Sequence, residues 1–204
     1  MNPAKLLARV ASEIPDQPAA CLGERCVTYA ELLDATKRLA GALRSMGLEP
    51  DSRVAVLLDN SIQWAIIYFA CAWAGLVIAP LDVRLHRQEL SAMLKDLQPH
   101  AVLAATSVSA DARSQLEAAT KGTQWIAIGP DSSQWQELLA AAPMDDPADR
   151  SEEDLSAILY TSGTTGRPRG AMMPFRVWDN FQIALEDIYH PPAGAGWMIS
   201  APMS

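Results

Sequence analysis

A short segment of the chain concentrates the residue types that can bind a phosphate group. Residues 160–170 read YTSGTTGRPRG, with three glycines, three threonines, one serine and two arginines. The glycines permit positive φ and let the backbone approach an anion without a Cβ in the way. Successive amides and hydroxyls would then point inward as an anion-binding nest, and the arginines add positive charge. The residues that we expect to contact phosphate are Thr161, Ser162, Gly163, Thr164, Thr165, Gly166 and Arg169.

Two other glycine-rich motifs do not fit this segment. A Walker A loop needs Gly-Lys where the chain has Pro168-Arg169, and the segment does not have the GxGxxG spacing of dinucleotide-binding folds. Composition alone leaves one alternative open, a flexible surface loop between a strand and a helix, because loops rich in glycine, serine and threonine are common.

The overall composition is that of a globular, acidic protein. Of the 204 residues 50% are hydrophobic, and the formal net charge is −8. This charge argues against nucleic acid or an anionic membrane surface as a partner, because both require clustered cations. It does not exclude a small anionic ligand, which needs only local positive charge.

The cysteines and histidines indicate neither a metal site nor a disulfide framework. Cys21, Cys26 and Cys71 are an odd number, and we expect reduced structural thiols, with a Cys21–Cys26 metal or redox pair as the less favoured alternative. The three histidines are scattered along the chain. Residues 1–18 lack the apolar stretch and cleavage site of a secretory signal peptide, so the expected location is the cytoplasm.

One uncharged apolar stretch is long enough to be a candidate membrane span. Residues 64–81 read WAIIYFACAWAGLVIAPL, but Gly75 and Pro80 interrupt the stretch, and Asp59 and Asp82 flank it without a basic anchor. A helix that ends near Gly75, followed by a buried strand, explains these features better. We therefore expect no transmembrane span.

Strand-like and helix-like segments alternate from residue 53 onward. We expect strands at 54–58, 76–80, 101–106 and 124–129, and helices at 61–74, 87–97 and 110–120. Apolar strands separated by helices indicate an α/β fold with a parallel sheet that is covered on both faces. Upstream, the pattern predicts a hairpin over 19–27 and a helix that starts at a Thr28–Glu31 capping box and stops at Gly47.

An acidic connection divides the predicted elements. Residues 141–154, AAPMDDPADRSEED, hold two prolines and six acidic residues, so we expect a solvated surface loop. This loop separates an N-terminal α/β subdomain (1–140), across a linker (141–155), from the start of another subdomain (156–204). The third part begins with a strand at 156–162 that leads into the glycines. The pattern also predicts helical character at 175–188 and a buried strand at 197–203.

The glycine-rich segment resembles the YTSGTTGxPKG signature of the adenylate-forming (AMP-binding) superfamily, and ten of its eleven positions fit. This superfamily includes acyl-CoA synthetases, luciferases and the adenylation domains of peptide synthetases. VTYAEL (27–32) is similar to the family's LTYAEL, and residues 51–90 are similar to the stretch from GDRVAL through AGAVxVPLNPRLTxxEL. The resemblance covers residues 5–204 and is closest to the N-terminal portion of a fatty-acid or acyl-CoA synthetase, so the fold would be an incomplete N-terminal domain.

The resemblance implies a two-step reaction. A carboxylic acid attacks the α-phosphate of Mg-ATP to give an acyl-adenylate and pyrophosphate, and a thiol, most often that of coenzyme A, then takes the acyl group. In this scheme the loop holds the β- and γ-phosphates, and Arg169 occupies the family's lysine position. ATP, Mg²⁺ and coenzyme A are the implied cofactors, and a small carboxylic acid is the implied partner.

The chain departs from the family pattern in two places. Arg169 replaces a point charge by a planar fork, which changes the geometry of a phosphate contact. Downstream, Pro174-Phe175-Arg176-Val177 stands where the family usually has Thr-His-x-Asn. This difference suggests a less typical substrate or weakened activity.

Several parts of the family's machinery are not found in these 204 residues. They include the adenine pocket, the Tyr-Gly-x-Thr-Glu segment and the C-terminal catalytic lysine, so no catalytic residue is assigned. We expect the chain to be an N-terminal fragment of an acyl-CoA synthetase that is inactive alone and that self-associates through unpaired apolar faces. The alternatives are a non-catalytic nucleotide- or partner-binding remnant and a peptide-synthetase adenylation domain.

Overall fold

The structure, a computed structural model, describes residues 2–161 and 168–178 of the chain. The helices in these residues are α1 (Pro3–Glu13), α2 (Tyr29–Ser45), α3 (Ile62–Ala74), α4 (Arg87–Leu97), α5 (Ala110–Ala119) and α6 (Ser133–Leu139). The strands are β1 (Pro18–Leu22), β2 (Arg25–Thr28), β3 (Arg53–Leu57), β4 (Val77–Pro80), β5 (Ala101–Ala105), β6 (Gln124–Ile128), β7 (Leu155–Thr161) and β8 (Arg169–Pro174).

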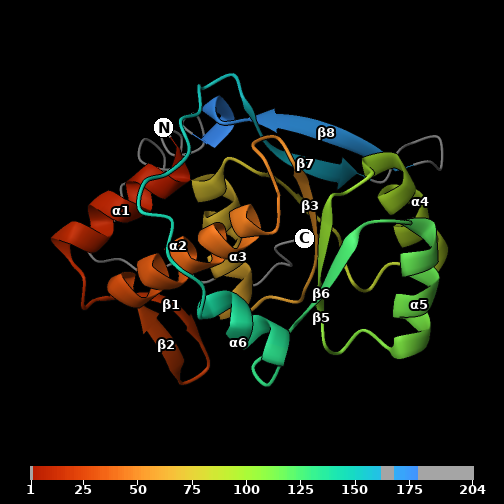
Figure 1. The fold of residues 1–204 in the computed structure, drawn as a ribbon, viewed down its shortest axis with the longest axis horizontal. Helices are drawn as coiled ribbons and strands as arrows, with labels where there is room; N and C mark the ends of the chain where they lie inside the picture. Colours follow the sequence, from red (N-terminus) through yellow and green to blue (C-terminus); the bar gives the residue numbers. More distant parts are fainter. Residues whose placement is uncertain (1, 162–167, 179–204) are drawn as a thin grey trace.

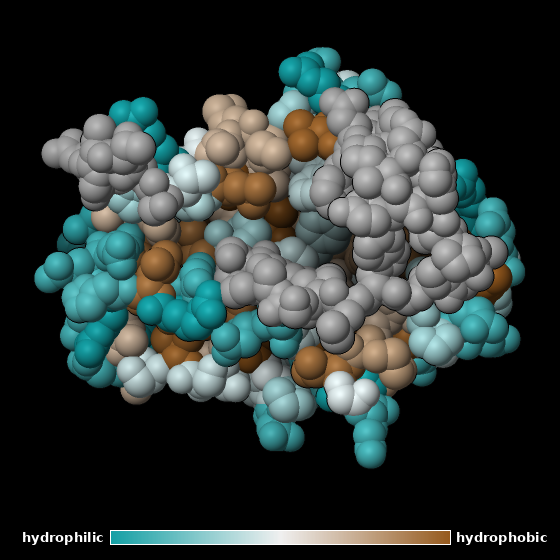
Figure 2. Space-filling model, turned by 180° about the vertical axis from the view of Figure 1, so that it is seen from behind, coloured by the Kyte–Doolittle hydropathy of each residue, from teal (hydrophilic) through white to brown (hydrophobic). Residues whose placement is uncertain are grey.

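A six-stranded sheet lies between two layers of helices. Its order is β6-β5-β3-β4-β7-β8, and every neighbouring pair is parallel except β7 and β8. Helices α2, α3 and α6 lie on one face, with α1 outside them, and α4 and α5 lie on the other face (Figure 1). Seen from behind, hydrophilic residues cover both flanks of the molecule (Figure 2). The expected α/β fold with a covered parallel sheet is confirmed, and β1 and β2 form a separate small antiparallel sheet.

The most apolar part of the chain folds as a helix and a strand. The amide of Trp64 donates to Ser61 Oγ at 3.1 Å where α3 begins, and Gly75, with φ of 72°, ends the helix in the left-handed conformation. β4 then enters the sheet between β3 and β7. Among the described residues, no helix has the length and apolar character needed to cross a membrane.

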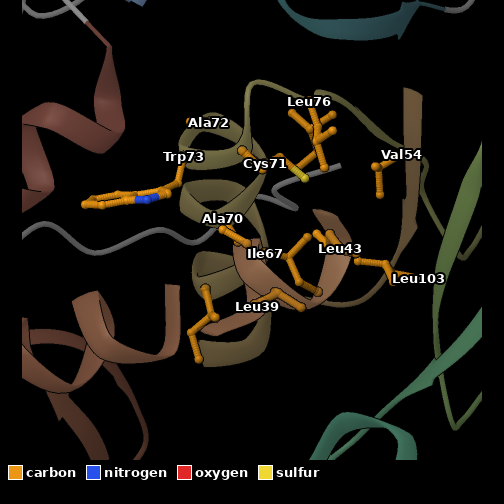
Figure 3. Packing of buried hydrophobic residues seen from close by; sticks show 14 of the residues in the cluster. Leu39, Leu43, Val54, Ile67, Ala70, Cys71, Ala72, Trp73, Leu76 and Leu103 are labelled. Atoms are coloured by element: carbon orange, nitrogen blue, oxygen red, sulfur yellow. The ribbon is translucent and has the colours of Figure 1, made fainter. Parts of the chain in front are cut away.

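Two hydrophobic clusters hold the sheet between its helices. In the first, Leu39 and Leu43 of α2 and Ile67 of α3 point toward Val54 and Leu103 of the sheet (Figure 3). In the second, leucines of α4 and α5 cover the opposite face. Full burial of each such side chain contributes about 1.5–3 kcal/mol. Both faces of the sheet are therefore fixed by packing.

The segment after the glycine-rich loop is a strand, which the sequence analysis did not predict. β8 pairs antiparallel with β7, so the loop connects the two strands of a hairpin, not a strand and a helix. The strand contains Gly170 and ends at Pro174, and both residue types weaken a strand pattern. Pro174 is tolerated because β8 is an edge strand. Of the helix expected at 175–188, the structure describes residues 175–178, of which 176–178 are helical; the strand expected at 197–203 lies outside the described residues.

The acidic connection is docked onto the helices, contrary to the expectation of a solvated loop. We call residues 141–150 the strap. The amide of Met144 donates to the carbonyl of Lys37 (2.9 Å), Trp73 Nε1 donates to the carbonyl of Met144 (3.0 Å), and the amide of Ala148 donates to the carbonyl of Trp73 (2.7 Å). The last carbonyls of a helix have no intrahelical partner, so the end of α3 offers an acceptor to an extended backbone. The acidic side chains of the strap remain exposed, and only this part of the expectation holds.

An arginine fixes the end of the strap. The side chain of Arg150 is only 7% exposed and forms ion pairs with Asp51 and Asp154. Asp51 lies just before β3 and Asp154 just before β7. Arg150 therefore ties the strap to the starts of two strands of the sheet.

The strands before and after the connection belong to one sheet. β7 pairs with β4 at Ile78 and Ala157 and is continued by β8. The division into residues 1–140, 141–155 and 156–204 therefore does not coincide with a break in the sheet, and it stays a prediction.

Cys21 and Cys26 form a disulfide, so the expectation of reduced thiols is wrong for this pair. The predicted hairpin is present, and its register places the two cysteines directly opposite each other, with 4.1 Å between their Cα atoms. The turn at Gly23, with φ of 61°, sets this register. Cys71 is a buried free thiol, as expected.

Candidate phosphate-binding site

The glycine-rich loop leaves the sheet at the edge where ligands of α/β folds bind. β7 runs parallel to β4, so Thr161 lies at the same edge as the carboxyl ends of the other parallel strands. Open α/β sheets bind ligands in the crevice outside the carboxyl ends of their strands. The chain therefore enters the glycine-rich segment from Thr161, at the edge where a nucleotide is expected.

Of the seven predicted phosphate contacts, the structure describes Thr161 and Arg169, and it brings these two together. Thr161 and Arg169 are partners at the last paired position of the hairpin before the loop, and both are exposed. The other five predicted contacts lie outside the described residues: Ser162, Gly163, Thr164, Thr165 and Gly166. A hydroxyl and a guanidinium thus lie at the two ends of the loop, where both are accessible to an anion.

Tyr160, on β7 just before the loop, forms hydrogen bonds to helix α4. Tyr160 Oη donates to Asp96 Oδ2 at 2.7 Å and lies 3.3 Å from the carbonyl oxygen of Met93, both on α4. Burial, and then the hydrogen bond to the Asp96 carboxylate, raises the pKa of the Tyr160 phenol well above its ordinary value. The phenol is therefore a neutral donor at physiological pH. Tyr160 is the first residue of the YTSGTTGRPRG motif, but the sequence pattern predicts no role for it and no pairing with Asp96.

A charged pair lies at the carboxyl end of the neighbouring strand. Arg84 Nη2 lies 2.6 Å from Asp82 Oδ2, just after β4. The hydrogen bond from Arg84 holds the pKa of the Asp82 carboxyl below its ordinary value. Asp82 is thus ionised at neutral pH and already engaged by a cation, which limits its availability to a metal ion.

Of the residues that depart from the family pattern, Phe175 packs into the core, whereas Arg176 is exposed. Phe175 is 2% exposed, and its amide donates to the carbonyl of Asp154 at 3.0 Å. Trp178 Nε1 donates to Ser156 Oγ (2.8 Å), which in turn donates to the carbonyl of Met173 (2.8 Å). Phe175 therefore anchors the end of β8 in the core.

The described residues hold no metal centre, and their best-formed cavity lies away from the carboxyl edge of the sheet. No group of three or more His, Cys, Asp or Glu side chains could hold a metal ion in the part of the chain that is described. A cavity of about 590 Å³ lies at the opposite edge of the sheet, where Pro99 and Gln124 lie at the amino ends of β5 and β6. This cavity is therefore not part of the phosphate site.

Residues 7–204 match the family model described as AMP-binding enzyme. The chain belongs to the AMP-binding enzyme family. The resemblance that rests on YTSGTTGRPRG is thereby confirmed, and the family match extends over both sides of the hairpin.

Relatives of this AMP-binding chain include ligases and peptide synthetases. A 3-[(3aS,4S,7aS)-7a-methyl-1,5-dioxo-octahydro-1H-inden-4-yl]propanoyl:CoA ligase of Mycobacterium tuberculosis is 32% identical over 181 residues, which are 83% of this chain and 36% of the ligase. Tyrocidine synthase 3 of Brevibacillus parabrevis is 28% identical over 91% of this chain and 3% of the synthase. The crystal structure of ATP-bound MatB from Rhodopseudomonas palustris superposes with a TM-score of 0.77 at 31% identity, over 93% of this chain and 38% of MatB. The chain thus spans little more than a third of the ligase and of MatB.

Proposed function

We propose that the chain is the ATP-gripping N-terminal part of an acid–thiol ligase, most simply an acyl-CoA synthetase. The observation that carries this proposal is the signature loop in a hairpin at the carboxyl edge of the sheet, with Thr161 and Arg169 paired at its two ends. The substrates would be a small carboxylic acid, ATP and coenzyme A. The CoA ligase among the relatives and the ATP in the MatB structure support this choice.

The loop's role would be to bind the leaving group. The carboxylate forms a bond to the α-phosphorus, the bond between the α-phosphorus and the bridging oxygen breaks, and pyrophosphate leaves with the electron pair. Backbone amides and hydroxyls of residues 161–166 and the guanidinium of Arg169 would stabilise the negative charge that develops on the pyrophosphate. A thiol then attacks the acyl carbonyl, loses its proton and releases AMP.

Magnesium would enter this site with the nucleotide. The described residues lack a cluster of metal ligands, and Mg²⁺ in nucleotide sites is commonly held by one or two carboxylates and the substrate's phosphates. We therefore treat Mg²⁺ as part of the Mg-ATP substrate, with the loop as the group that holds its β- and γ-phosphates.

The proposal has two further parts that concern the chain as given. We infer that these 204 residues do not complete the reaction alone, since residues 161–169 would bind only the leaving group and the chain spans 36% of the CoA ligase relative. We also propose a cytoplasmic location, although the Cys21–Cys26 disulfide is more typical of an oxidising compartment. Reduced Cys21 and Cys26 thiols in freshly lysed cells would support the cytoplasm, and a disulfide there would count against it.

The experiment that tests the function is ATP–pyrophosphate exchange with a panel of carboxylic acids. The protein is expressed from the complete reading frame that contains residues 1–204, and the 204-residue chain is assayed beside it. We expect exchange with at least one acid for the complete product and none for the 204-residue chain. Absence of exchange with every acid would count against the ligase, and exchange by the 204-residue chain would overturn its inferred inactivity.

A peptide-synthetase adenylation domain is the second candidate, and tyrocidine synthase 3 is the observation that favours it. Exchange that depends on amino acids and transfer to a carrier-protein thiol, not to coenzyme A, would identify this candidate. A non-catalytic nucleotide-binding remnant would bind Mg-ATP without exchange in the complete product.

A further inference from the structure

We propose that Asp96 is a positioning residue for the phosphate loop: it holds Tyr160, and through Tyr160 the loop end of the β7–β8 hairpin, against helix α4. The proposal rests on the proposed function only in assigning phosphate to the loop. The hydrogen bond and the packing that hold the hairpin against α4 involve described residues alone.

The loop end of the hairpin has little backbone pairing with the parallel part of the sheet. The register between β4 and β7 consists of one pair, Ile78 and Ala157, at the start of β7. Beyond it, residues 158–161 are paired only with β8, which is the edge strand of the sheet. An edge hairpin held on one side opens easily, so an additional anchor near the loop would limit its motion.

Tyr160 provides a link between three elements at this place. Its ring packs beside Ile158 against the cluster under α4, and its hydroxyl reaches the carboxylate of Asp96 and the carbonyl of Met93. Its partner on β8 is Gly170. A Cβ at Gly170 would lie 2.7 Å from Ile158 Cγ2 and 3.4 Å from Tyr160 Cζ, so the side chains of β7 lie over bare backbone of β8.

The two described phosphate contacts are direct neighbours of this link. Thr161 follows Tyr160 on β7, and Arg169 precedes Gly170 on β8. Whatever fixes the Tyr160–Gly170 pair therefore fixes the starting points of both ends of the loop. Pre-organised donors lose less entropy when a ligand binds, which is how an anchor outside the site raises affinity.

The test compares Asp96→Ala, Tyr160→Phe, the double variant and Asp96→Asn, in which the side-chain amide oxygen can still accept from the phenol. Glu137→Ala, at an exposed position on α6, is the matched control. Amide hydrogen exchange is measured at residues 158–161 and 169–172, with β5 as the internal reference. We expect exchange at the hairpin to rise about threefold to tenfold in both single variants, because a hydrogen bond to an ionised group is lost.

The double variant should exchange no faster than either single variant, and Asp96→Asn should restore most of the protection. Unchanged exchange at the hairpin in Asp96→Ala, or an equal rise at β5, would overturn the proposal. A second readout is the affinity of the chain for Mg-ATP. It should weaken about threefold or more in Asp96→Ala and remain constant in Glu137→Ala.

The two readouts separate the inference from the proposed function. Faster exchange at the hairpin with undetectable Mg-ATP binding by the wild-type chain would support the anchor and count against the ATP loop. Measurable Mg-ATP binding that Asp96→Ala leaves unchanged would overturn the positioning role.

Discussion

At the scale of single residues, hydrogen bonds and burial decide which side chains remain available for chemistry. Tyr160 is committed to Asp96, and Asp82 is committed to Arg84. Thr161 and Arg169 are exposed at the ends of the loop. The Cys71 thiol, in contrast, is inaccessible: it is completely buried, and burial raises its pKa to about 12.

The thiols give a prediction at this scale. With the Cys21–Cys26 disulfide formed, the native protein should show no thiol that reacts with Ellman's reagent at pH 8, because the Cys71 thiol is buried and protonated. Unfolding in guanidinium chloride should expose one thiol, and reduction followed by unfolding should expose three. A fast-reacting thiol in the folded, non-reduced protein would contradict this description.

At the scale of elements, the strap (residues 141–150) connects the end of α3 with the start of β7. It passes the end of α3 so closely that a Cβ on Gly75 would lie 3.0 Å from Ala148 Cβ and 3.2 Å from Arg150 Cδ. Gly47 ends α2 with a similar positive φ, 86° against 72°, but no atom lies within 4 Å of its Cβ position. A substitution at Gly47 therefore tests the cost of backbone strain alone, and a substitution at Gly75 tests that cost together with the contact against the strap.

We predict that Gly47→Ala lowers the free energy of unfolding by about 1 kcal/mol, the cost of a left-handed conformation for a residue with a Cβ. Gly75→Ala should cost about 1–3 kcal/mol more, because the strap and Arg150 must also move. Urea unfolding monitored by circular dichroism measures both. Equal losses for the two variants would indicate that the strap does not pack against α3.

The elements differ in how well the sequence predicts them, for physical reasons. The strands and helices from residue 53 to 129 have strong periodic patterns, and the Thr28–Glu31 capping box marks the start of α2 directly. α6 is short and β8 contains a glycine and ends at a proline, so neither was predicted, and the docking of the strap depends on groups at the end of α3 that lie far away in sequence. The motif of the phosphate loop can be recognised from the sequence alone. Its anchor at Asp96 cannot be predicted from the sequence, because 64 residues separate Asp96 from Tyr160 and only the fold brings them together.

At the scale of the whole molecule, β8 is the last strand of the sheet among the described residues. Within the part of the chain that the structure describes, β8 has a neighbour on one side only, and Met172 on this strand is 69% exposed. An unpaired edge with exposed apolar residues favours association between chains. The chain spans 36% of the CoA ligase relative, so in a longer protein this edge has further sequence available to cover it.

We predict that the 204-residue chain self-associates with rising concentration in light scattering. Met172→Lys should reduce the association, because a lysine on an edge strand opposes further pairing. Leu22→Lys, at a residue of β1 that is 56% exposed and away from this edge, is the matched control and should have little effect. A wild-type monomer over the whole concentration range would contradict the prediction.

The central claim, that residues 161–169 hold the β- and γ-phosphates of ATP, is tested most directly by titrating the ¹⁵N-labelled 204-residue chain. The ligands are Mg-ATP, Mg-pyrophosphate and AMP, and the readout is the amide resonances of the chain. We predict that Mg-ATP and Mg-pyrophosphate shift the same amides of residues 161–166 and 169, that AMP leaves them unchanged, and that Arg169→Ala weakens the binding of both polyphosphates. Equal shifts with AMP, or no shift of these amides with either polyphosphate, would contradict the claim.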